Sequence, residues 1–111
     1  MTDSGSDRLR KFLHAKIKIA KRKKQIHPVY TQDMQLEIDC VKWALQKIEV
    51  NKLPNDRLEG VIKTMIQDLK KRKEKAMIRL ETDDLWTKIE TLQWVLFVIF
   101  AIRNGQMVVI P

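Results

Sequence analysis

The chain contains few of the residues that build disulfide-rich, hairpin-rich or membrane-spanning proteins. It has one cysteine, so no disulfide can form within the chain, which is typical of a reducing compartment. Glycine and proline number three each, too few for an architecture of many β-hairpins. The longest apolar run, residues 94–102, is shorter than the roughly 20 residues that a helix needs to cross a bilayer. These shortages favour one all-α domain over residues 1–111.

No constellation of catalytic or metal-binding residues is recognisable. The histidines, His14 and His27, lack the cysteine and histidine spacing of a zinc site. The glycines are isolated, so no glycine-rich phosphate loop occurs, and no nucleophile elbow is present. Asp83 and Asp84 are explained by the start of a helix, whose dipole favours anions. We therefore expect no enzyme activity, no metal and no cofactor.

Residues 85–102 are the stretch that the rest of the chain is expected to cover. They begin with apolar residues at helical spacing and end in the apolar run. Such a run is usually a helix buried on most sides, with a membrane-inserting segment and a buried strand as alternatives. Asn104 and Gly105 are typical of a helix end, and residues 107–110 are expected to pack back on the body. The predicted core includes Trp43, Leu92, Trp94, Leu96, Ile99 and Phe100.

Three further segments have the spacing of amphipathic helices. Ser6 or Asp7 is expected to cap a short first one, Thr31 to cap a second, and Asn55 or Asp56 to cap a third. The third ends in a basic run, residues 70–75, which is explained by cations at a helix C-terminus. Thr82 is expected to begin the last helix. An apolar clasp is predicted just before it, formed by Met77, Ile78 and Leu80.

The positive charge is concentrated in the first quarter of the sequence. Residues 1–27 hold nine basic and two acidic side chains, whereas the remainder holds thirteen and twelve. The alternation of residues 16–19 and the pair His27-Pro28 favour an irregular or two-stranded basic flap over residues 16–30. We predict an anion-binding patch that binds acidic lipid or nucleic acid. Its residues are Arg8, Arg10, Lys11, Lys16, Lys18, Lys21, Arg22, Lys23 and Lys24.

The layout of about residues 8–105 resembles the matrix domain of lentiviral Gag polyproteins. A short first helix and a basic flap precede a helix carrying CVKWAL at residues 40–45. Residues 56–62 and 68–74, DRLEGVI and DLKKRKE, are similar to the third helix of the feline members. Thr91-Leu92 leads into an apolar helix like the buried central helix of that family.

The resemblance implies a compact bundle of about five helices whose flap and first helix supply lipid-facing cations. It also implies a structural role in retroviral virion assembly. The protein would then be found in the virion, in the host cytoplasm and at the inner face of the host plasma membrane. Phosphoinositides and RNA would be the ligands, and some members form trimers. Thr2 departs from the acylated glycine of many members. The alternative function is a nucleic-acid-binding module or a small basic viral regulatory protein, acting on RNA or a host factor.

Overall fold

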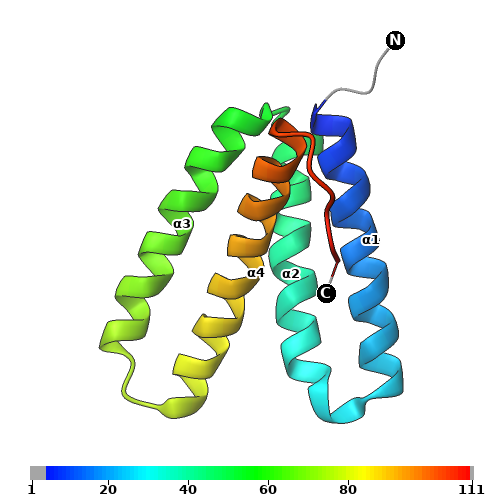
Figure 1. Ribbon diagram of the computed structural model, residues 1–111. Helices are drawn as coiled ribbons and strands as arrows, with labels where there is room; N and C mark the ends of the chain where they lie inside the picture. Colours follow the sequence, from blue (N-terminus) through cyan, green and yellow to red (C-terminus); the bar gives the residue numbers. More distant parts are fainter. Residues whose placement is uncertain (1–4, 111) are drawn as a thin grey trace.

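The computed structural model describes residues 5–110, and these contain helices and no strand (Figure 1). The all-α class is therefore confirmed, although this part of the chain has four α-helices and one 3₁₀ turn where about five helices were expected. The elements are α1 (Gly5–Ile26), η1 (Pro28–Tyr30), α2 (Thr31–Glu49), α3 (Asn55–Lys75) and α4 (Arg79–Arg103).

Short connections make each helix run antiparallel to the one before it, because a few residues can only fold the chain straight back. As a result, the α1–α2 and α3–α4 connections lie at one end of the bundle, and the α2–α3 loop lies at the other (Figure 1). Helix α4 contacts all three other α-helices, whereas α3 packs mainly on α4 and touches α2 little. In Figure 1, α3 diverges from α2 toward the α3–α4 turn.

The core lies along α4, as the apolar run predicted. Ile89, Val95 and Val98 are fully buried, and Leu92 and Ile99 are confirmed as core residues. Trp43, Trp94 and Leu96 are half-buried at the edge of the core. Phe100 is 52% exposed, so its assignment to the core was wrong. It lies on the same outward side of α4 as the exposed Phe97, one turn away.

Helix α4 is longer than the apolar run that it contains. By length and composition it is also the one described helix that could cross a membrane. The same composition is expected of a helix that other helices cover on most sides. Nine of its 25 residues are buried in the bundle, whereas Phe97 and Phe100 lie on an exposed side, so α4 is covered on fewer sides than the apolar run favoured.

The predicted basic flap over residues 16–30 was wrong. Residues 16–26 continue α1 without a break. The reason is that Leu9, Leu13, Ile17 and Ala20 recur at spacings of four and three, so all of them face the core. The short alternation at residues 16–19 is part of this longer helical period. Only His27 departs from helical geometry, with φ −123° and ψ 83°, because the ring of the following proline disfavours the α conformation at this position.

Several predicted helix starts were displaced. Helix α2 begins at Thr31, but the Thr31 hydroxyl donates back to the carbonyl of Pro28, 2.7 Å away. Pro54 precedes the first residue of α3, and its side chain makes no capping hydrogen bond. Thr82 lies inside α4, where its hydroxyl bonds the carbonyl of Ile78. Neither Asn55 nor Asp56 is therefore the cap of α3, and Thr82 does not begin α4.

The end of α4 was predicted correctly. Gly105 has φ +66°, a left-handed conformation that glycine adopts without strain. The amide of Gln106 donates to the carbonyl of Ala101 across 2.8 Å, which is the pattern of a Schellman motif. The chain then turns back, and the indole Nε1 of Trp94 donates to the carbonyl of Val109 across 3.2 Å. This bond holds the C-terminal segment against the bundle and Val108 packs on the core, but Met107 and Val109 are exposed, so the expected packing of residues 107–110 is met only in part.

Candidate anion-binding surface

The nine predicted anion-binding cations all lie in α1, but they do not all face solvent. Lys11, Lys18 and Arg22 are seven and four residues apart, so they form one line on the side of α1 away from the core. Arg8 and Lys21 flank that line and are also exposed. We call these five residues the α1 stripe. From Arg8 to Arg22 the stripe extends about 21 Å along the helix.

Lys16 is not part of this surface, which corrects the sequence prediction. It lies on the core side of α1 and is 3% exposed. Its ammonium group is 3.1 Å from the carboxylate of Glu37 on α2 and 5.6 Å from the ring centroid of Trp94. A buried cation requires such a counter-charge, because desolvation otherwise penalises it heavily. Lys16 therefore has a structural role between α1, α2 and α4.

Two other predicted cations are engaged within the protein. Arg10 lies 3.5 Å from Asp7 one turn earlier, and Lys24, which is half-buried, donates to the amide oxygen of Gln35 across 2.6 Å. By contrast, five of the other exposed cations form no ion pair with a carboxylate in the described range. Those cations are Arg8, Lys18, Lys21, Arg22 and Lys23. Most of the positive charge of α1 is thus directed to solvent.

A second group of cations lies at the same end of the bundle as the last turn of α1. It comprises the basic run of α3 together with the first residue of α4 (Figure 1). Arg72 pairs with Asp68 at 3.1 Å, and the Lys73 ammonium lies 5.1 Å from the ring centroid of Trp86. The sequence showed this run, but only the antiparallel topology brings it to the same end as α1. The exposed members are Lys70, Lys71, Arg72, Lys75 and Arg79.

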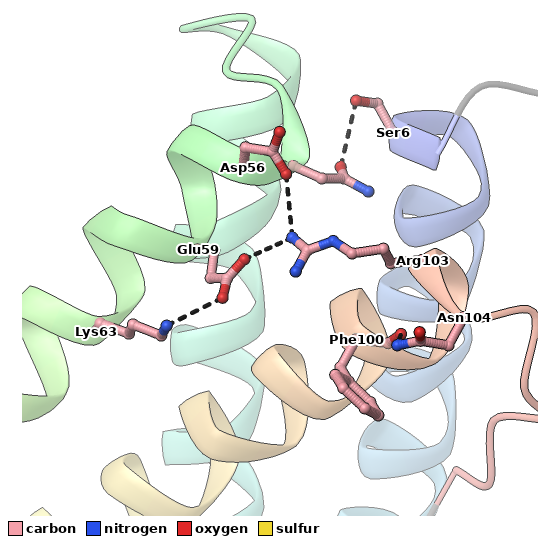
Figure 2. A network of polar contacts seen from close by, with 8 residues as sticks. Ser6, Asp56, Glu59, Lys63, Phe100, Arg103 and Asn104 are labelled. Carbon is pink, nitrogen blue, oxygen red and sulfur yellow. Dashed lines mark hydrogen bonds and ion pairs between the residues drawn. The ribbon is translucent and has the colours of Figure 1, made fainter.

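At the opposite end of the bundle, one arginine pairs with two carboxylates. Figure 2 shows Arg103, at the end of α4, donating to Asp56 across 3.0 Å and to Glu59 across 2.6 Å. Lys63 lies 3.0 Å from the other oxygen of Glu59. The hydrogen bonds from Arg103 and Lys63 lower the pKa of Glu59. This network joins the end of α4 to the start of α3. The helix dipole favours a cation such as Arg103 at the C-terminus of α4 and anions such as Asp56 at the N-terminus of α3.

Three further features of the described residues lie outside these charged groups. In the described range, no group of three His, Cys, Asp or Glu side chains is placed to hold a metal ion. Burial raises the pKa of the Cys40 thiol to about 11, which keeps it protonated and unreactive at neutral pH. An open groove between α2 and α3 is lined mainly by apolar side chains, among them Trp43, Leu53, Val61 and Met65.

The chain matches no known protein family model, no curated protein and no solved structure. The lentiviral matrix domain is thus a hypothesis that rests on the sequence pattern alone.

Proposed function

We propose that this protein is a structural module that docks on anionic phospholipid surfaces, in the manner of the lentiviral matrix domains it resembles. In that role it would bind phosphoinositide and other acidic headgroups at the inner face of the plasma membrane and direct a polyprotein to virion assembly. The observation that carries the proposal is the α1 stripe, five exposed cations on one side of a single rigid helix.

The strength of the stripe suits reversible docking. Each lysine or arginine near an anionic leaflet contributes about 1 kcal/mol, so the stripe supplies several kcal/mol. This is enough for transient binding and too little for a stable anchor. Oligomerisation, such as the trimers of the resembling family, would then supply the missing avidity.

Nucleic acid is the second candidate ligand, because the same cations would bind a phosphate backbone. Proteins that bind single strands usually add aromatic side chains on which bases stack. Phe12 is the aromatic residue of α1, and it is half-buried against the core. The exposed aromatic residues Trp86, Phe97 and Phe100 belong to α4 instead. A cationic line without stacking partners favours a headgroup layer over single-stranded RNA.

The test is co-sedimentation with vesicles of increasing phosphatidylserine content, with and without phosphoinositide. The first variant, Lys18→Gln/Lys21→Gln/Arg22→Gln, removes three charges from the α1 stripe. The control, Lys42→Gln/Lys52→Gln/Arg57→Gln, removes three exposed charges from α2, α3 and their connection. We expect binding to rise with acidic lipid, the stripe variant to lose it and the control to keep most of it. RNA that displaces the protein at physiological salt would favour the nucleic-acid alternative.

A further inference from the structure

The α3–α4 turn exposes large apolar side chains that its sequence predicted to be packed. Met77 is 97% exposed, and Ile78 and Leu80 are 65% and 67% exposed. Helix α3 ends at Lys75 because Ala76 is extended, with φ −70° and ψ 130°, and α4 begins at Arg79. Met77 therefore lies at the apex of a three-residue connection. The predicted apolar clasp was wrong, since these side chains point away from the core.

Cations surround this apolar apex on both sides along the chain. Lys70, Lys71 and Lys75 precede it and Arg79 follows it, and all four are exposed. Within the described residues, none of the four pairs with a carboxylate. Exposed apolar side chains flanked by exposed cations along the chain are costly in water, but they match an anionic interface with an apolar interior.

The α1–α2 corner repeats the combination. Ile26 is 61% exposed and Val29 is 89% exposed, and both follow the exposed cations Arg22 and Lys23. Both corners lie at the same end of the bundle (Figure 1). One extended anionic surface can therefore meet both corners together, whereas a small protein partner would have to reach two separate projections.

We propose that the α3–α4 turn is a second membrane contact, in which Met77, Ile78 and Leu80 enter the boundary between headgroups and acyl chains while the surrounding cations bind acidic headgroups. This inference rests on the proposed docking of α1 and specifies its orientation. The bundle meets the bilayer with the end that carries both corners. Lys18, Lys21 and Arg22 then lie closer to the headgroups than Arg8, which is nearer the opposite end of α1.

The test measures insertion and binding separately, on vesicles containing about 30% phosphatidylserine. An environment-sensitive fluorophore is attached at Met77→Cys in a Cys40→Ala background, so that one thiol carries the label. We expect a blue shift and quenching by shallow brominated lipids when vesicles are added. A label at Val50→Cys, which lies at the opposite end of the bundle, should show neither change.

The matching binding variant is Met77→Ser/Ile78→Ser/Leu80→Ser, and its control is Val50→Ser/Met107→Ser, which replaces exposed apolar residues elsewhere. We expect the first to weaken vesicle partitioning by about tenfold and the control by less than about twofold. All five residues are exposed, so both variants should unfold at wild-type urea concentrations.

Two failures can be told apart. If the wild type binds acidic vesicles and the α1 stripe variant does not, while the label at residue 77 stays aqueous, the second contact is overturned and the proposed function stands. If the wild type binds no acidic vesicles, both are overturned. A serine variant that keeps full vesicle binding but loses a wild-type dimer, measured by sedimentation equilibrium, would assign the turn to contact between two copies and overturn the inference.

Discussion

The ammonium group of Lys16 lies 3.1 Å from the carboxylate of Glu37, and the Lys16 side chain is only 4% exposed. This ion pair joins α1 to α2 beside the Trp94 ring. It takes one charge out of the predicted ligand surface and gives it a role in packing. The pair therefore separates two functions that the sequence placed in one basic segment.

Glu37→Gln should lower the free energy of unfolding by about 1–3 kcal/mol, because Lys16 would keep a buried charge without the Glu37 carboxylate. Lys16→Met should cost less, since the Glu37 side chain is 18% exposed and can reach water. Urea denaturation measures both changes. The control is Asp68→Asn, which breaks the exposed pair with Arg72 and should cost less than about 0.5 kcal/mol.

Vesicle binding by Lys16→Met, compared with that of Lys18→Gln, tests which cations form the docking surface. Lys16→Met should bind acidic vesicles as the wild type does, because its ammonium group does not reach the headgroups. Lys18→Gln removes one charge from the exposed stripe and should weaken binding. Equal losses in the two variants would mean that Lys16 leaves its buried place on the membrane.

Ile99→Ala should destabilise the protein by about 2–5 kcal/mol, because the buried side chain would leave a cavity. Phe100→Ala, at the next position, should cost less than about 1 kcal/mol, since Phe100 is exposed. Thermal and urea unfolding give the comparison directly. A larger loss for Phe100→Ala would place that ring against another surface in solution.

The stability of the Arg103 network should depend on pH in one direction. The pKa of Glu59 is lowered in the folded state by hydrogen bonds from Arg103 and Lys63. A lowered folded pKa contributes stability above the unfolded value, roughly 4.3, and this contribution is lost as pH falls through the folded value. The urea midpoint of wild type should therefore exceed that of Glu59→Gln at pH 6, and the gap should close toward pH 3.

A matched substitution on the same helix, Glu74→Gln, changes an exposed carboxyl remote from Arg103. Its gap to wild type should stay nearly constant between pH 6 and pH 3. A Glu59→Gln gap that is equally constant would show that the network contributes nothing through the charge of Glu59.

Alkylation of Cys40 by iodoacetamide should be slow in the folded protein. Burial raises its pKa from 9.0 to about 11, so the thiolate fraction at pH 8 falls on the order of 100-fold. Urea should restore the ordinary rate, and mass spectrometry follows both reactions. Rapid labelling without denaturant would mean that the space between α2, α3 and α4 opens readily.

The sequence predicted the parts of the fold that have a long periodic apolar pattern or a residue with a special backbone preference. Apolar spacing predicted helix α2 and the buried side of α3. The backbone preference of Gly105 predicted the end of α4. The flap failed because four residues cannot distinguish a period of two from a period of 3.6. The decisive residues, Leu13 and Ala20, lie outside that short alternation.

The candidate site was predictable in content but not in arrangement. The basic composition of residues 8–24 identified α1, but the partner of Lys16 lies on another helix, 21 positions away. The assignment of Phe100 to the core failed for a related reason. In a run that is apolar on every side, nothing local indicates which side the neighbouring helices cover. The shared end of the two basic corners likewise depends on topology, which composition does not encode.

The small contact between α3 and α2 has a consequence for local unfolding. Because α3 packs mainly on α4 and touches α2 little, we expect it to open locally at a lower free energy than the other three helices. Its amide protons should then exchange with deuterium sooner than those at the centre of α2 or α4.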